Sequence, residues 1–134
     1  MAQADPAKAV KACLVTEWAD SQPDWTATLE VADDYRPVAG HPALLVADDG
    51  GNPVVGGAWM VGNDLMRKTL RLTAFARGRT ESLDVVNAAI DFVVANRPAG
   101  IARIENVSAV LETRDRATGA YLASVTVPVT VRPL

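Results

Sequence analysis

The sequence predicts an α+β fold: a mostly antiparallel or mixed β-sheet of about four to six strands, with an N-terminal helix and a second helix packed on it. Two stretches repeat apolar residues at helical spacing, and the segments between and after them alternate apolar and polar residues as strands do. The 134 residues suit one ordinary domain, and no internal repeat or linker divides them. We therefore expect residues 1–134 to form a single domain.

The first helix is predicted over residues 6–20. Asp5 followed by Pro6 is a typical helix start, since an acidic side chain caps free amides and proline fits the first helical position. An apolar stripe then recurs every four residues, at Val10, Leu14 and Trp18. Ser21-Gln22-Pro23 is expected to end the helix, because the residue before a proline disfavours helical geometry.

Two strands are predicted next, over residues 25–31 and 43–47, separated by a polar loop with two prolines. The stretch Asp48-Asp49-Gly50-Gly51-Asn52-Pro53 is rich in turn-forming residues and predicts a turn. Residues 48–66 contain pairs of glycines, so we expect a long mobile excursion or hairpin arm. Its apolar side chains, such as Trp59, are expected to be exposed and to suit contact with a partner.

The second half of the chain predicts a strand over 68–77 and a helix over 81–96, with Thr80 as the cap. The helix stripe consists of Leu83, Val86, Ile90 and Val93 or Val94. Two strands follow, over 103–113 and 120–131. Pro128 cannot donate to a ladder, so that part of the last strand is expected at an edge or near a bulge.

Charge is distributed unevenly along the chain. Residues 1–64 hold ten acids and three bases, for a charge of −7, whereas residues 65–134 hold six acids and ten bases, for +4. Two interpretations stay open: internal neutralisation within one domain, or acidic and basic faces that meet between neighbouring copies. The overall charge of −3 argues against direct nucleic-acid binding, which depends on clustered Lys and Arg.

Catalytic chemistry finds little support in the sequence. The single cysteine, Cys13, lies beside the first helical stripe and is predicted to be a small buried apolar residue. The single histidine, His41, has no second ligand nearby and is predicted at the surface or in a hydrogen bond. The acidic stretch at Asp48 lacks the spacing of a calcium loop. We expect no enzyme, no metal site and no cofactor.

The densest basic segment is the predicted strand at 68–77 with its flanks. Strand parity places Arg67, Arg71 and Arg77 on one sheet face with Phe75 among them. This is either a solvated face opposite a helix-covered one, or a contact surface anchored by arginine and an aromatic ring. The candidate subunit or partner interface comprises Arg67, Arg71, Phe75, Arg77, Arg79, Asp48, Asp49 and Trp59.

The order of these elements resembles that of the tail terminator proteins of long-tailed bacteriophages. The resemblance includes the junction Arg71-Leu72-Thr73-Ala74-Phe75-Ala76-Arg77-Gly78-Arg79-Thr80-Glu81 and the long final hairpin, which ends at Val131-Arg132-Pro133. The resemblance spans nearly the whole chain and rests on no catalytic motif. It implies an α+β protomer assembled into a six-membered ring that caps the tail tube, ends its polymerisation and offers a docking surface to the head connector.

The resemblance also implies the partners. These are further copies of the chain in the ring, the major tail tube protein, the head connector or stopper, and duplex DNA that passes through the lumen during ejection without specific binding. It implies a location at the tail–head junction of the virion, and in the host cytoplasm during assembly. No stretch has the length of a membrane helix, so we expect no membrane partner.

Two alternatives remain open: another neck component such as a stopper or adaptor, and a small-ligand-binding cytoplasmic α+β domain with a pocket between helix 81–96 and the sheet. The opening Met-Ala-Gln-Ala-Asp lacks the features of a signal peptide, which also favours the cytoplasm.

Overall fold

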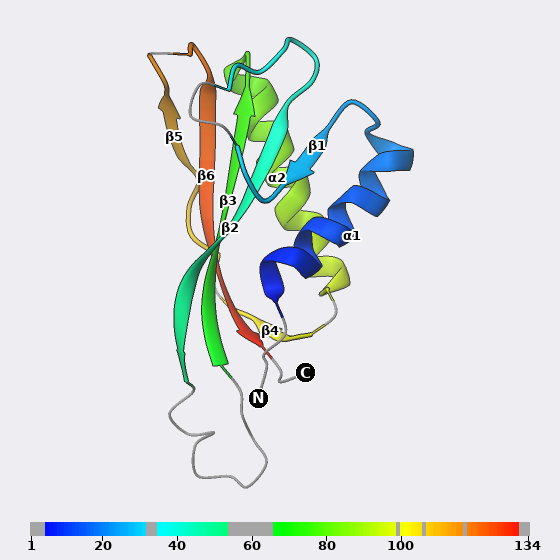
Figure 1. Cartoon of the computed structure of the whole chain (residues 1–134), viewed down its shortest axis with the longest axis vertical. Helices are drawn as coiled ribbons and strands as arrows, with labels where there is room; N and C mark the ends of the chain where they lie inside the picture. The colour runs from blue at the N-terminus through cyan, green and yellow to red at the C-terminus, as the bar shows by residue number, and fades with distance from the viewer. Residues whose placement is uncertain are drawn as a thin grey trace, which may run out of the picture.

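A computed structural model describes residues 5–31, 35–53, 66–98, 100–105, 107–116 and 118–131. Within these residues, two helices and six strands follow one another (Figure 1). In order they are α1 (Pro6–Ser21), β1 (Thr26–Thr28), β2 (Ala43–Pro53), β3 (Met66–Ala76), α2 (Arg79–Asn96), β4 (Ile101–Ile104), β5 (Leu111–Arg114) and β6 (Tyr121–Val131).

The six strands form one mixed sheet in the order β1-β2-β3-β6-β4. β5 also pairs with β6, along the same edge as β4 and opposite β3. The pair β1–β2 is parallel, whereas every other pair is antiparallel. One edge of the sheet is therefore β1, and the other is shared by β4 and β5.

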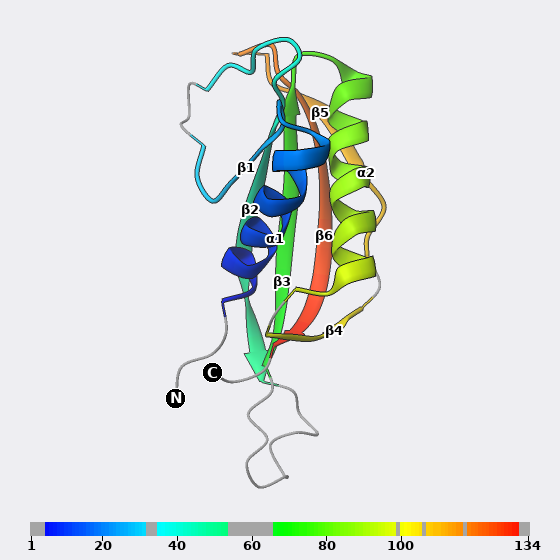
Figure 2. The ribbon, with the colours of Figure 1, turned by 90° about the vertical axis from the view of Figure 1, so that its right-hand side faces the viewer.

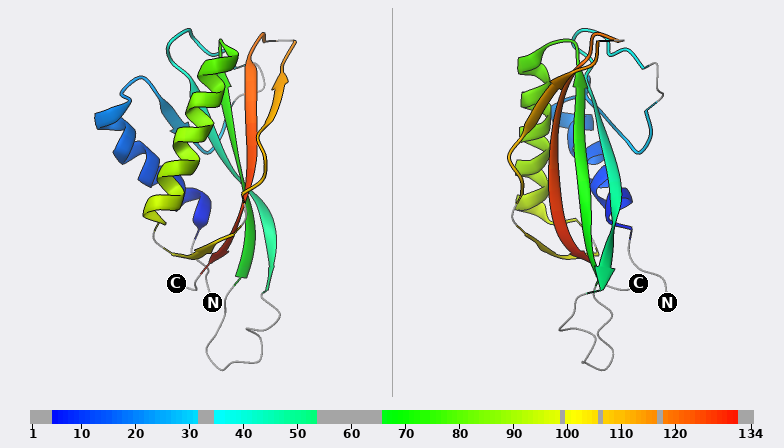
Figure 3. Two further views of the ribbon diagram at one scale, coloured as in Figure 1. Left: turned by 180° about the vertical axis from the view of Figure 1, so that it is seen from behind. Right: turned by 90° about the vertical axis from the view of Figure 1, so that its left-hand side faces the viewer.

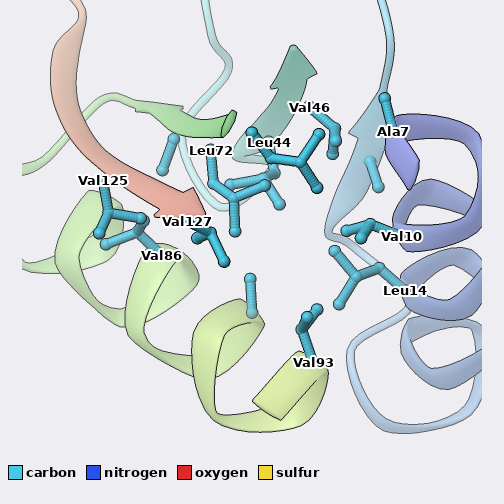
Figure 4. Packing of buried hydrophobic residues seen from close by; sticks show 14 of the residues in the cluster. Ala7, Val10, Leu14, Leu44, Val46, Leu72, Val86, Val93, Val125 and Val127 are labelled. Carbon is cyan, nitrogen blue, oxygen red and sulfur yellow. The ribbon is translucent and has the colours of Figure 1, made fainter. Parts of the chain in front are cut away.

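Both helices pack on one face of this sheet (Figure 2). α1 covers β1 and β2, while α2 covers β3 and β6. Alternation along the strands turns the apolar side chains of one parity towards the helices, where they are fully buried (Figure 4). The core includes Val10, Leu14, Leu44, Val46, Leu72, Val86, Val93, Val125 and Val127. The predicted fold class is confirmed, with the N-terminal helix and a second helix packed on a mixed sheet.

The start of α1 is confirmed in detail. The Asp5 carboxylate accepts a hydrogen bond from the Lys8 backbone amide at 3.2 Å, and Pro6 occupies the first turn. The helix then buries the predicted stripe and ends at Ser21, as expected.

Replacement of Asp5 by alanine is expected to lower the free energy of unfolding by about 1 kcal/mol, because the amide bonded to the carboxylate loses its protein acceptor. Urea denaturation followed by circular dichroism measures the change. Asp5→Asn is the matched control, since asparagine also caps; equal losses in both variants contradict a capping role.

The turn predicted at Asp48–Pro53 is wrong, because β2 continues through it to Pro53. A bulge between Asp48 and Gly51 absorbs an extra residue in the pairing with β3. Strand parity then sends consecutive acids to opposite faces of the sheet. Asp48 meets Lys68 at 3.3 Å, and Asp49 meets Arg71 at 3.1 Å. Ion pairs with Lys68 and Arg71 on β3 thus support a strand in a segment whose composition favours a turn.

Both ends of the excursion or hairpin arm predicted across 48–66 belong to paired strands: Asp48–Pro53 are part of β2, and Met66 begins β3. The remainder, residues 54–65, lies outside the described residues and includes Trp59.

The strand predicted at 25–31 is reduced to Thr26–Thr28. The Thr28 hydroxyl donates to the Glu30 carbonyl at 2.9 Å and accepts from the Glu30 amide at 3.3 Å, a local turn that ends the strand. The predicted cap at Thr80 is also wrong. Gly78 is the residue before the helix, and Thr80 lies in its first turn, because the Ser82 amide already bonds to the Gly78 carbonyl at 3.1 Å.

The strand predicted at 103–113 is divided into β4 and β5, and Pro128 on β6 lies opposite the division. The Pro128 carbonyl accepts a hydrogen bond from the Glu105 amide at 2.9 Å, so the backbone of Pro128 faces the segment between β4 and β5. Proline has no N–H to donate on that side, and no regular strand pairs with it there. Two residues away, the Thr126 amide donates to the Ser108 hydroxyl at 2.9 Å. Pro128 therefore lies at an irregularity, as expected, although β6 itself has neighbours on both sides.

Candidate interaction surface

The sheet face turned away from α1 and α2, here called the outer face, is covered by neither described helix (Figure 3, right). The register lines its side chains up in rows across four strands. One row joins Leu45, Thr73, Ser124 and Leu111, and the next joins Ala43, Phe75, Leu122 and Thr113. The Thr73 and Ser124 hydroxyls are 3.1 Å apart and share a hydrogen bond. These two rows contain no charged side chain.

The predicted basic face lies on the outer face along β3. Arg67 and Arg71 share strand parity with Phe75 on β3, and Arg77 follows directly after the last residue of that strand. Arg67 and Arg71 are exposed, and Arg77 is exposed as well. Strand alternation therefore places Arg67, Arg71 and Phe75 on the same face of the sheet, as predicted.

Most of these bases already have an acid within the chain. Arg67 contacts Glu105 at 3.1 Å, and Arg71 contacts Asp49 at 3.1 Å. Arg79 lies off the strand, in the first turn of α2, where it contacts Glu112 on β5 at 2.6 Å. Such exposed pairs contribute about 0–1 kcal/mol each, but they remove the local excess of positive charge. This arrangement matches the internal-neutralisation interpretation for the segment.

Arg77 differs from its neighbours. It makes no ion pair with any residue that the structure describes, and it borders a hollow of about 490 Å³ formed with Gly40 and the start of α2. Its guanidinium is thus available to an outside partner.

Phe75 is only partly available for contact with another molecule. The Tyr35 ring stands edge-on to the Phe75 ring, with centroids 6.1 Å apart. Because this geometry is favourable for aromatic pairs, the loop before β2 already uses one side of Phe75. Tyr35, Glu105 and Glu112 were not singled out from the sequence, since nothing in their local pattern indicates which distant residue they contact.

Cys13 is half-buried, not fully buried as predicted. It lines a hollow of about 530 Å³ between the helices with Phe92 and Pro98. Burial raises the pKa of the Cys13 thiol, and the negative charge of Glu17 raises this pKa further.

A raised pKa lowers the thiolate fraction at any given pH, and the thiolate is the reactive form. Iodoacetamide at pH 8 is therefore expected to modify Cys13 in the folded protein more slowly than in urea-unfolded protein. Mass spectrometry against time measures both rates. Glu17→Gln is expected to speed the folded-state reaction; a folded rate above the unfolded rate contradicts the assignment.

His41 lies at the surface, with its Nδ1 atom 3.8 Å from the Asp24 carboxylate. Among the described residues, no group of three or more His, Cys, Asp or Glu side chains is arranged to hold a metal ion. Neither α1 nor α2 has the length and apolar character needed to cross a membrane.

The region between α2 and the sheet is filled by Val85, Val86, Ala89 and Val93. Two hollows lie at the ends of α2. One of about 650 Å³ lies between its last turn and β4, and one of about 270 Å³ lies between its first turn and β5. Both are lined in part by arginine.

Comparison with protein-family models and with curated proteins finds no match to this chain.

Proposed function

We propose that this chain is a structural virion protein, a tail terminator that forms a ring on the end of the tail tube, stops its polymerisation and joins it to the head connector. The observation that carries the proposal is the order of elements. An N-terminal helix, a long strand pair, a Gly–Arg junction into a second helix and a closing hairpin are the basis of the resemblance. Each occurs in the structure at or near its expected place.

The mechanism is steric and adhesive. A ring that binds the last tube layer through one surface, and presents a different surface on the other side, blocks the addition of another layer. The outer face supports this role, because an open sheet face with mixed alkyl, hydroxyl and arginine groups suits protein contact. The net charge of −3 is favourable for a conduit, since it limits adhesion of passing DNA.

Within this proposal, the outer face and the adjoining Arg77 contact the tube or the connector. The candidate interface set from the sequence stays part of the proposal. Arg67, Arg71, Phe75 and Asp49 lie on the outer face, and Arg77 adjoins it. Arg79 lies at the start of α2, Asp48 points to the other face, and Trp59 lies outside the described residues. Arg77 is the strongest single candidate, because the other described arginines of the set are paired within the chain.

The proposal is tested by adding the purified chain to a polymerising major tail tube protein of a long-tailed bacteriophage. Electron microscopy is expected to show shorter tubes with an annulus at one end, and light scattering a six-membered assembly. Tubes of unaltered length and bare ends contradict it. Binding to the head connector alone indicates another neck component. A monomer stabilised by a small metabolite indicates a ligand-binding domain.

The combined change Arg71→Glu and Arg77→Glu is expected to abolish tube capping while leaving the circular dichroism unchanged, because both side chains are exposed. Asp49→Arg with Arg71→Glu is the matched control, since it reverses an internal pair and keeps Arg77. Capping by the first variant at the wild-type level removes Arg71 and Arg77 from the contact.

A further inference from the structure

One edge of the sheet carries unneutralised negative charge. Residues 12–31 contain four acids and no lysine or arginine. They form the C-terminal half of α1, the connection to β1, and β1 with its following turn, all at the β1 edge. The group is here called the acidic margin and comprises Glu17, Asp20, Asp24 and Glu30. Asp20, Asp24 and Glu30 are exposed, and His41 lies 3.8 Å from Asp24.

The opposite edge carries positive charge at the end of β5. Arg114 and Arg116 are both exposed there and are here called the basic margin. The Arg114 guanidinium lies over the Tyr121 ring, 5.0 Å from its centroid, which positions the side chain. The two exposed arginines flank one half-buried acid, Asp115. The nearby acid Glu112 is occupied by Arg79 at 2.6 Å, so it does not neutralise the margin.

Each margin also carries a large exposed apolar side chain. Val15 on α1 is 47% exposed, and Leu111 on β5 is 69% exposed. All four residues of β5 are exposed, and the strand pairs with β6 alone among the described strands. An apolar centre bordered by complementary charges is the usual composition of a protein contact.

We infer that neighbouring copies of this chain associate through these two margins, the acidic margin of one copy against the basic margin of the next. The inference rests on the proposed ring and identifies its lateral contact. Opposite views place α1 and β5 on opposite sides of the protomer (Figures 1 and 3, left), so one copy can contact two neighbours at once. A contact between two different surfaces is heterologous, and it closes into a ring when the rotation allows.

The same charges oppose a two-fold dimer through either edge. Pairing two acidic margins, or two basic margins, places like charges together, which costs free energy and suppresses that mode. The second copy is thus the occupant that fits both edges of the sheet.

The test uses two full-length variants and their combination. The acid-reversed variant carries Asp20→Lys, Asp24→Lys and Glu30→Lys, which leave Glu17 as the one acid of a now positive margin. The base-reversed variant carries Arg114→Glu and Arg116→Glu. Each alone brings like charges together at every lateral contact, and light scattering is expected to show monomers under conditions where the wild type assembles. The combined variant, which carries all five changes, is expected to assemble again. Lys8→Glu with Arg103→Glu, a similar charge change outside both margins, is expected to assemble like the wild type.

Mixing the two reversed variants in equal amounts gives the most specific outcome. The positive margins of one match the negative margins of the other, so alternating rings are expected to form. Such rings close only with an even number of subunits, which a six-membered ring satisfies. Assembly of either reversed variant alone at the wild-type level, or failure of both the mixture and the combined variant to assemble, overturns the inference.

Circular dichroism and thermal unfolding of each variant separate loss of contact from loss of fold. A wild-type protein that stays monomeric at low ionic strength and millimolar concentration also overturns the contact, because screening is then minimal. Failure of the proposed function has a different signature: the wild type and the mixture assemble, but neither shortens tail tubes.

Discussion

Replacement of Trp18 by alanine is expected to lower the free energy of unfolding by about 4 kcal/mol. Trp18 is only 3% exposed and lies on the buried face of α1. Its ring stands edge-on to that of Trp25, with centroids 5.2 Å apart, so it joins the helix to the start of β1. Because a domain of this size has a total stability of about 5–15 kcal/mol, this one change removes a large share of it.

Chemical denaturation of the wild type, Trp18→Ala, Trp25→Ala and the double variant measures the contribution of the ring pair. Trp25 is only partly buried, so its single change is expected to cost less. The coupling between the two rings is expected to be about 1 kcal/mol. Additive losses contradict the ring contact, and a Trp18→Ala loss below that of Trp25→Ala contradicts the placement of α1.

Leu44→Ala is expected to cost about 3 kcal/mol, whereas Leu45→Ala is expected to cost about 1 kcal/mol. The two residues are neighbours on β2 and point to opposite faces of the sheet. Leu44 is fully buried beneath the helices, and Leu45 is half-buried on the outer face. The larger loss comes from the cavity that alanine leaves in a close-packed core.

This pair of variants is its own matched control, since the same side chain is shortened at adjacent positions. Urea unfolding with a common m-value measures both. A register shifted by one residue exchanges the two faces, so a Leu45→Ala loss equal to or above that of Leu44→Ala contradicts the pairing of β2 with β3.

Local patterns predicted the helices and the central strands well. Val10, Leu14 and Trp18 identified the buried face of α1, and alternation in the last strand identified the inward residues of β6. These signals work because a helix closes its hydrogen bonds within a few residues, and because strand alternation repeats every two. The grouping of Arg67 and Arg71 with Phe75 followed from the same alternation.

Errors arose where a distant segment decides the outcome. The stretch from Asp48 to Pro53 has the composition of a turn, yet Lys68 and Arg71 on β3 hold its two acids within a bulged strand. The strand expected at 103–113 is interrupted because Pro128 on β6 offers no amide there. Neither partner can be identified by reading the affected segment alone.

The candidate surfaces show the same division. By itself, the sequence determined the two helices, the parity of the strands and the excess of acids in the first half over the second. Only the tertiary structure decided which charges cancel: Arg67, Lys68, Arg71 and Arg79 contact acids of other segments, whereas Arg77 makes no ion pair with a described residue. The physical reason is that periodicity is a property of neighbouring residues, whereas ion pairing depends on which strands the folded chain places side by side.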